Sequence, residues 1–442
     1  MVDGVQAATT PHFMRRTNAT LVLQAVRDHG PLSRTGLAKL TGLSKPTVNE
    51  IVSRLCAQGY IREGESRSAR QERPGPRATS LSFVADVGYL MGLELGSARI
   101  AAMVTDLTGR PLAHEQTHLG NGAEAATAER FMAAVEDLVA SALAAAQVSR
   151  DRLWSVGVGI PGFIDQEQGS LTLAPAFAGW RNVPFRHLLA SLFGCPVFIE
   201  NKVQLSALAE QRWGAARDVQ NAVYLHLGTG IGMGLLIRGE IFCGADGFAG
   251  EVGFMDLPDP ADPTPFNFGS FEWAAGGLAY ARLGRRAVEN GQSPRLAELS
   301  RRAAGAVRAE MVFQAAREGD VAAQAIVDTL VGRLATGVAN ICCVLNPEMV
   351  ILGAGLSRAG TMLLDPLRER VAALVPVPPR HMTISALSGR STVLGAVERA
   401  LRAVEDNRFR LFEDPAVEAE TAGGREPAVP ERVQAMGRSR YR

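Results

Sequence analysis

A repeated order of predicted elements is the feature that most limits how this 442-residue chain folds. From residue 87 to residue 213 the apolar pattern predicts three meandering strands and then alternating helices and strands. A second meander begins at Ala222 and is again followed by helices and a strand, which ends at residue 352. Two successive segments of the same β-β-β-α-β-α order predict a two-lobed α/β domain.

The rest of the second segment predicts mostly helix. We expect helices over 271–290, 296–317, 321–345 and 395–404, and strands over 349–352 and 383–386. We place the domain at residues 85–402, with a hinge near 200–222 and a C-terminal return near 385–402. Two such lobes with a cleft between them are typical of the actin-like, sugar-kinase (ribonuclease H-like) architecture.

Residues 32–55 predict two short helices joined by a turn at Gly42. Ser44 stands where an N-cap is expected, and Pro46 falls in the first turn of the second helix. An ordinary αα-hairpin is the alternative. The neighbours favour a winged helix-turn-helix over residues 14–84, because a helix over 18–29 precedes the pair and a strand, an arginine-rich loop and a strand follow it.

The second helix of such a unit enters the DNA major groove, and basic side chains of the wing contact phosphates. The candidate DNA-binding residues are Ser33, Arg34, Ser44, Lys45, Pro46, Thr47, Asn49, Glu50, Arg54, Arg67, Arg70, Arg73 and Arg77. The formal net charge of the whole chain is only +1, so DNA contacts must come from this local patch.

Composition excludes several other classes. A hydrophobic content of 47% and a charged content of 21% are those of a folded domain, and no run of eighteen apolar residues predicts a membrane span. The first residues lack the apolar core of a signal peptide, so we expect a cytoplasmic protein. Residues 1–13 and 403–442 lack apolar periodicity and are predicted to be disordered.

Six fragments in a fixed order carry a family resemblance: GLSKPTVNEIVSRL, GVGIPGFID, IEN, LGTGIGMGLLIRGEI, AGEVGF and VILGAGLS. Together they resemble the ROK family of repressors and sugar kinases, specifically its winged-helix transcriptional branch, over residues 14–402. In the kinases, the resemblance implies two glycine-rich turns that hold nucleotide phosphates and an Asp after an Asn that deprotonates the sugar. It also implies a zinc site of one His and three Cys. In the repressors, it implies that the same cleft binds a sugar and alters DNA affinity.

This chain departs from the kinase pattern at Lys202, where the resemblance implies the catalytic Asp. A protonated lysine has no lone pair to accept the hydroxyl proton, so we predict no catalytic residue and no enzymatic activity. Two interpretations of Lys202 stay open. It is a drifted position, which we favour, or it pairs with an anionic ligand such as a sugar acid or a sugar phosphate.

The two phosphate turns differ in the sequence. In the first turn (residues 94–99), Ser97 and Ala98 replace the Gly and Thr of the kinases, whereas the second turn (residues 228–232) is intact. We interpret the second turn as retained for strand geometry rather than for ATP. The vestigial phosphate-binding residues are Glu94, Gly96, Gly228, Thr229, Gly230 and Gly232.

The zinc ligands are replaced as well. Phe254 stands at the His position, and Phe266 and Phe268 stand at cysteine positions, so we predict no metal and no other cofactor. We expect this segment to pack as a hydrophobic plug. The candidate sugar-binding residues are Gly162, Asn201, Lys202, Glu251 and Glu272.

The resulting prediction is a homodimeric (or dimer-of-dimers) repressor of carbohydrate-metabolism genes, whose partners are double-stranded operator DNA and a sugar or sugar-derivative effector. Two alternatives stay open. One is an active, ATP-dependent sugar kinase with a fused DNA-binding domain. The other is a DNA-binding protein that is controlled by a protein partner.

Overall fold

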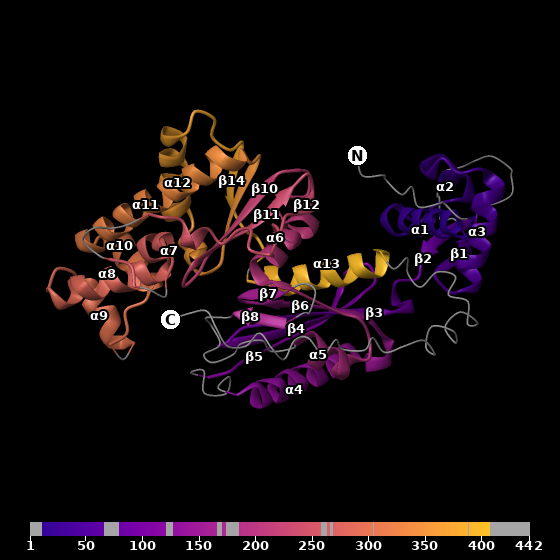
Figure 1. Ribbon diagram of the computed structural model, residues 1–442, viewed down its shortest axis with the longest axis horizontal. Helices are drawn as coiled ribbons and strands as arrows, with labels where there is room; N and C mark the ends of the chain where they lie inside the picture. Colours follow the sequence, from indigo (N-terminus) through magenta and orange to yellow (C-terminus); the bar gives the residue numbers. More distant parts are fainter. Residues whose placement is uncertain are drawn as a thin grey trace, which may run out of the picture. The chain divides into compact units, whose positions relative to one another are not determined.

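The chain divides into two compact units, residues 1–84 with 404–442 and residues 85–403. The computed structural model in Figure 1 describes residues 11–65, 79–120, 127–165, 170–173, 185–257, 263–265, 268–303, 305–387 and 389–406. Residues 1–10 and 407–442, for which we predicted disorder, lie outside this part of the chain.

The first unit is a three-helix bundle with a two-stranded antiparallel sheet. Its elements are α1 (Pro11–His29), α2 (Arg34–Thr41), α3 (Lys45–Ala57), β1 (Ile61–Glu65) and β2 (Thr79–Phe83). Val22, Leu37, Val52 and Leu55 are fully buried between these elements, which explains why short helices are stable here. Helix α1 begins at Pro11, so the prediction that residues 11–13 are disordered is wrong.

The larger unit contains two five-stranded sheets of the same topology. The first sheet has the order β5-β4-β3-β6-β9, and the second has the order β12-β11-β10-β13-β14. In each sheet the first three strands are antiparallel, and the remaining two are parallel to their neighbours. The repeated order that the sequence predicted is therefore confirmed.

The strands of the first sheet are β3 (Tyr89–Leu95), β4 (Arg99–Asp106), β5 (Pro111–His118), β6 (Leu153–Ile160) and β9 (Val197–Asn201). Those of the second are β10 (Ala222–Leu227), β11 (Ile231–Ile237), β12 (Glu240–Ile241), β13 (Met349–Gly353) and β14 (His381–Ile384). A separate hairpin joins β7 (Phe163–Asp165) and β8 (Ser170–Leu173).

Helices cover the sheets. They are α4 (Ala128–Ala146), α5 (Phe185–Phe193), α6 (Lys202–Trp213), α7 (Ser270–Ala275), α8 (Gly277–Glu289), α9 (Pro294–Arg302), α10 (Ala309–Arg317), α11 (Val321–Leu345), α12 (Thr361–Leu374) and α13 (Ser391–Asp406). Short 3₁₀ turns lie at Ala85–Val87, Arg150–Arg152, Val252–Phe254 and Gly355–Ala359. Figure 1 shows α4 and α5 on one face of the first sheet and α13 on the other.

Helix α13 approaches the first sheet over glycines. A Cβ at Gly157 would lie 1.9 Å from the carbonyl oxygen of Ala396, and one at Gly92 would lie 2.4 Å from that of Val393. Any larger side chain at these two positions would push the helix away, because protein interiors are close-packed. The return of the chain to the first sheet therefore depends on glycine at these positions.

Helix α6 contacts strands of both sheets, β6 and β9 in the first and β10 and β11 in the second. A Cβ at Gly159 of β6 would lie 3.0 Å from Leu205, and one at Gly234 of β11 would lie 2.6 Å from the oxygen of Val203. The first turn of α6 is thus the place where residues from the two sheets come together.

Several boundaries differ from the prediction. The helix predicted over 271–290 is two helices that break at Gly276, and the one over 296–317 is also two, α9 and α10. Helix α12, which contains Pro366, was not predicted. Helix α13 extends to Asp406, so residues 403–406 are helical rather than disordered.

Helix α11 is long and apolar enough to cross a membrane by length and composition. Of its most apolar window, 56% is buried inside the protein, and Val331, Leu334 and Val338 are fully buried in the core beside the second sheet. Its apolar surface is therefore used for packing, as in the core helix of a globular domain.

Candidate DNA interface and effector site

The helix pair of the first unit has the geometry that the sequence predicted. Gly42 ends α2 with a φ of 72°, and the Ser44 hydroxyl accepts a hydrogen bond of 3.3 Å from the Thr47 amide at the start of α3. Ser33 likewise caps α2, since its Oγ accepts from the Gly36 amide at 3.1 Å. These caps satisfy amide groups at the helix starts and fix the turn between the helices.

The predicted DNA-binding residues of α3 lie on its outer face. Lys45, Pro46, Asn49 and Glu50 are exposed, as are Ser44 and Arg54, whereas Thr47 is partly buried. Val48, Ile51, Val52 and Leu55 occupy the opposite, buried face. One side of α3 is therefore available to a groove, while the other holds the helix in the bundle.

Arg34 ties α2 to α3 and to the wing. Its Nη1 donates to the backbone oxygen and Oδ1 of Asn49 at 3.1 and 3.3 Å, and its Nη2 pairs with Glu63 on β1. Glu50 and Arg54 form an ion pair of 3.0 Å one turn apart. Several candidate contact residues thus form hydrogen bonds or ion pairs with one another. The wing arginines Arg67, Arg70, Arg73 and Arg77 lie outside the described residues.

In the second unit, Asn201 and Lys202 stand at the start of α6. Asn201 is the N-cap, because its Oδ1 accepts from the Val203 amide at 2.8 Å, and its Nδ2 donates to the Gly162 oxygen at 3.2 Å. The structure thus joins three of the predicted sugar-binding residues. Lys202 is the first residue of the helix, and burial lowers the pKa of its amine below the ordinary value for lysine.

The first of the two candidate phosphate turns, residues 94–99, is closed by an ion pair between its own side chains. Glu94, the first residue of this turn, pairs with Arg99 across the turn at 2.8 Å. The Gly96 amide donates to the Arg99 oxygen at 3.0 Å, and Ser97 follows at the tip. The carboxylate and the guanidinium therefore neutralise each other where the kinase pattern would hold a phosphate.

The second turn is held from behind by α7 and α8. The Gly277 amide donates to the Gly228 oxygen at 2.9 Å, and the Leu278 amide donates to the Thr229 oxygen at 3.3 Å. A Cβ at Gly230 would lie 2.3 Å from Oε2 of Glu272. Glu272 thus leaves little room for a side chain at Gly230, which supports the interpretation that geometry retains this glycine. Across the ladder, Gly232 pairs with His226.

Glu272 is a structural acceptor as well as a candidate ligand. Its Oε1 accepts from the Gly269 amide at 3.2 Å and its Oε2 from the Ile231 amide at 3.4 Å. Glu251 lies close enough that burial and then the charge of Glu272 raise the pKa of its carboxyl. The two predicted glutamates are therefore neighbours beside the second turn.

Sequence reasoning missed His226, which lies on β10 two residues before the second turn. Burial and then the charge of Lys202 lower the pKa of its imidazole to about 3. Its Nδ1 is buried with no hydrogen-bond partner among the described residues. A histidine inside the otherwise apolar strand AVYLHL was the signal that marked this position.

The residues at the family's zinc positions do not fit a zinc ion. Phe254 has no ligand atom and is 57% exposed, and the ring of Phe268 lies 5.3 Å from that of Trp273. The expected hydrophobic plug is wrong for both described phenylalanines, since Phe254 is exposed and Phe268 is 37% exposed despite its contact with Trp273. Phe266 lies outside the described residues.

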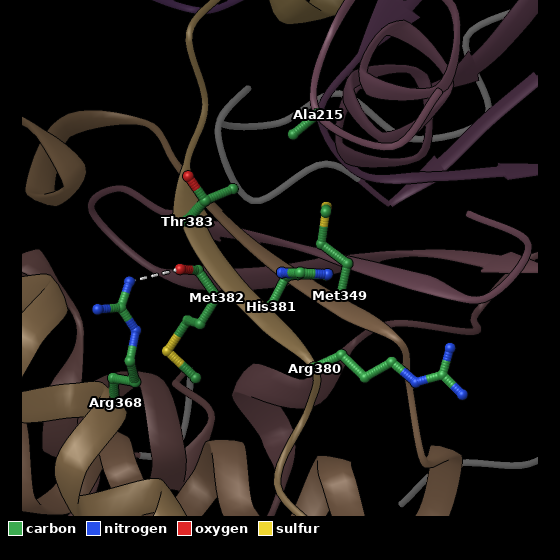
Figure 2. A pocket seen from close by; sticks show the side chains of 7 residues that line it. All are labelled: Ala215, Met349, Arg368, Arg380, His381, Met382 and Thr383. Carbon is green, nitrogen blue, oxygen red and sulfur yellow. Dashed lines mark hydrogen bonds between the residues drawn. The ribbon is translucent and has the colours of Figure 1, made fainter. Parts of the chain in front are cut away.

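A surface pocket lies elsewhere, along β14, as Figure 2 shows. Its lining residues are Ala215, Met349, Arg368, Arg380, His381, Met382 and Thr383. Arg368 donates to the Met382 oxygen at 2.8 Å, and Arg380 faces Glu348 at 3.8 Å. None of the predicted ligand residues lines this pocket.

Comparisons with known proteins match two different families to two parts of the chain. The model of the ROK family matches residues 90–402, and that of the MarR family matches residues 15–72. The chain belongs to the ROK family. Because the family match covers the two repeated sheets, the predicted two-lobed sugar-kinase-like fold is confirmed.

Individual ROK relatives include repressors and kinases. The chain is 30% identical to a xylose repressor of Caldicellulosiruptor bescii over 87% of its own length and 95% of the relative. It is 39% identical to a glucokinase of Thermotoga maritima, over 54% of its length and 77% of the relative.

Two solved structures of ROK proteins show the same fold. A ROK family transcriptional regulator, a homologue of the E. coli MLC protein, has a TM-score of 0.74 at 22% identity and covers 89% of this chain and 98% of its own. A ROK family glucokinase from Streptomyces griseus, in complex with glucose and AMPPNP, has a TM-score of 0.59 at 26% identity, with 71% and 100% covered.

Proposed function

We propose that this chain is a sequence-specific DNA-binding repressor of carbohydrate-metabolism genes, which senses a sugar or sugar derivative without phosphorylating it. The observation that carries the proposal is the extent of the match to the named xylose repressor, because it includes both the winged helix and the ROK domain. The glucokinase match covers only about half of the chain. The family resemblance places Lys202 where phosphoryl transfer requires a carboxylate, which supports sensing without phosphorylation.

The proposal includes a homodimer in the cytoplasm. Two winged helices that are related by a dyad bind two half-sites of a palindromic operator. A sugar changes the affinity for DNA only when it binds one conformation of the protein better than another. The candidate sugar-binding groups are the start of α6 with Gly162, Asn201 and Lys202, and the pair Glu251 and Glu272.

Fluorescence anisotropy with duplexes from the region upstream of the chain's own gene tests the DNA-binding part. We expect these duplexes to bind about 10³-fold or more tightly than random duplex at physiological salt, and a sugar to reduce that affinity. Lys45→Ala on α3 is expected to weaken operator binding by about 1–3 kcal/mol, whereas Lys39→Ala on α2 serves as the matched control. Equal binding to operator and random duplex would refute the proposal.

An active sugar kinase is the second candidate, and the identity of 39% to the Thermotoga glucokinase favours it. A coupled ADP-release assay over a panel of aldoses and amino sugars distinguishes the two functions. We expect no turnover above a protein-free control. Turnover that Lys202→Ala or Gly230→Ala removes would establish the kinase instead.

A further inference from the structure

Lys202 is an unusual cation in this chain. The sequence has only three lysines, Lys39, Lys45 and Lys202, among 46 basic residues, so Lys202 is the sole lysine of the ROK domain. Its amine forms no ion pair and no side-chain hydrogen bond with any residue that the structure describes. A partly buried ammonium without a partner is costly, and such groups are normally paired.

The surroundings of Lys202 do not compensate its charge. The charges that act on it are those of Glu94 and Arg99, which already form an ion pair with each other at 2.8 Å. Lys202 is also the first residue of α6, where the helix dipole is positive and favours anions over cations. Lys202, Glu94 and Arg99 together therefore carry a net charge of +1 when Lys202 is protonated. The positive end of the α6 dipole adds to this charge.

His226 lies opposite the same helix turn. Its strand neighbours Ala222 and Tyr224 share its face of β10 and pack against Val203 and Ala207 of α6. A Cβ at Gly232, its partner in the ladder, would lie 3.2 Å from the Val203 side chain. His226 thus faces the first turn of α6, where Lys202 stands.

The imidazole adds hydrogen-bonding capacity and no second charge. With a pKa of about 3 the ring is neutral at pH 7, so it has one N–H donor and one acceptor nitrogen. One of its nitrogens, Nδ1, has no partner in the described part of the chain. An unpaired cation and a neutral donor at one helix start are the groups that a small anion requires.

We propose that Lys202 and His226 form an anion subsite of the effector site, and that this subsite binds the carboxylate of a sugar acid. The carboxylate accepts from the Lys202 ammonium and from an N–H of the His226 ring, while Asn201 and Gly162 border the sugar. A monoanion matches the single surplus charge. A phosphate ester carries about −1.5 to −2 at neutral pH, which exceeds that surplus and leaves part of its charge uncompensated.

This inference rests on the proposed sensing function, and calorimetry on the full chain tests it with matched ligand pairs. The probes are glucose against glucuronate and gluconate, xylose against xylonate, and glucose 6-phosphate. We expect at least one acid to bind tenfold or more tightly than its neutral partner. Neutral sugars that bind as tightly as every acid, or acids that do not bind at all, would overturn the proposal, and tighter binding of the phosphate would overturn the carboxylate assignment.

Variants identify the residue responsible. Lys202→Met keeps the length of the side chain without the charge, and we expect it to reduce the acid-to-neutral affinity ratio to within threefold of one. Arg285→Met, which removes an exposed charge on α8, is the control and leaves the ratio unchanged. Circular dichroism confirms that each variant is folded. A preference for acids that survives in Lys202→Met contradicts the assignment.

A chemical measurement gives an independent readout. Because Lys202 is the sole lysine after Lys45, mass spectrometry of acetylated protein reports the reactivity of this one amine. A bound carboxylate holds the amine protonated, so saturating acid is expected to slow acetylation several-fold more than saturating neutral sugar does. Equal rates would contradict the subsite. If neutral sugars release DNA while no acid binds, the sensing function stands and only this inference fails.

Discussion

The two halves of the ROK domain have the same strand order, but different contacts hold their candidate phosphate turns, residues 94–99 and residues 228–232. In the first half, Glu94 and Arg99 pair across the turn, so the charged groups satisfy each other. In the second half, the glycines are retained, and the amides of α8 and the Glu272 carboxylate hold the turn from behind. The comparison teaches that an intact glycine motif is not by itself a sign of nucleotide binding, because packing can also favour glycine, as it does where Glu272 lies against Gly230.

The largest expected effect comes from reversing the difference. Ser97→Gly, Ala98→Thr and Lys202→Asp together restore the kinase pattern of the first half while the second turn stays as it is. We expect ATP-dependent phosphorylation of an aldose to rise about 10²–10⁴-fold over the variant that keeps Lys202, which is the usual effect of a general base. A changed chain without turnover would contradict this expectation and would show that packing alone retains the glycines of the second turn.

Gly157 tests how the first half is covered. Gly157→Ala would place a Cβ 1.9 Å from the Ala396 oxygen, a backbone atom that moves only with the whole of α13. We expect a loss of about 3 kcal/mol in the free energy of unfolding, measured by urea denaturation. Gly64→Ala on β1 is the control, because a Cβ there meets no atom within 4 Å. Equal midpoints for both variants would mean that α13 tolerates the shift.

Glu272 tests the second turn. Glu272→Ala leaves the Gly269 and Ile231 amides without their acceptor, and we expect it to lower the free energy of unfolding by about 1–3 kcal/mol. Glu272→Gln keeps one oxygen acceptor and is expected to lose less. Thermal unfolding of the two variants decides the order, and the reverse order would remove Glu272 from the support of this turn.

The smallest effect is expected in the first turn. Glu94→Gln removes the ion pair with Arg99, whose side chain is 33% exposed, so we expect a change below about 1 kcal/mol. Chemical denaturation in low and high salt measures it, and the difference from the wild type should shrink in high salt. A loss as large as that of Glu272→Ala would show that the two turns depend on their carboxylates equally.

Much of this fold was predictable because the sequence signals for its strands, caps and turns lie within a few residues of one another. Alternating apolar residues placed the meanders, and Ser44 and Gly42 placed the helix turn before any contact was known. The break at Gly276 was missed because apolar periodicity continues through it, and α12 was missed because Pro366 interrupts its pattern. The Arg34 and Glu63 pair joins residues 29 positions apart, so no local pattern could predict it.

The candidate site was predictable as a set of positions and not as a set of contacts. The family pattern located Asn201, Lys202, Glu251 and Glu272. That pattern does not show which side-chain oxygens already accept hydrogen bonds from backbone amides, as those of Asn201 and Glu272 do. His226 was missed because the sequence marks it as a polar residue in an apolar strand but does not show that it faces the start of α6.

The position of α13 has a consequence for the order in which the chain is made. The strands that bear Gly92 and Gly157 leave the ribosome early, whereas Ala396 emerges more than two hundred residues after Gly157. Throughout that interval the face of the first sheet that contains Gly92 and Gly157 stays exposed, because α13, which packs on it, has not yet been synthesised. Nascent chains that stop before Ser391 are therefore expected to recruit chaperones and to be degraded rather than to accumulate as a folded first half.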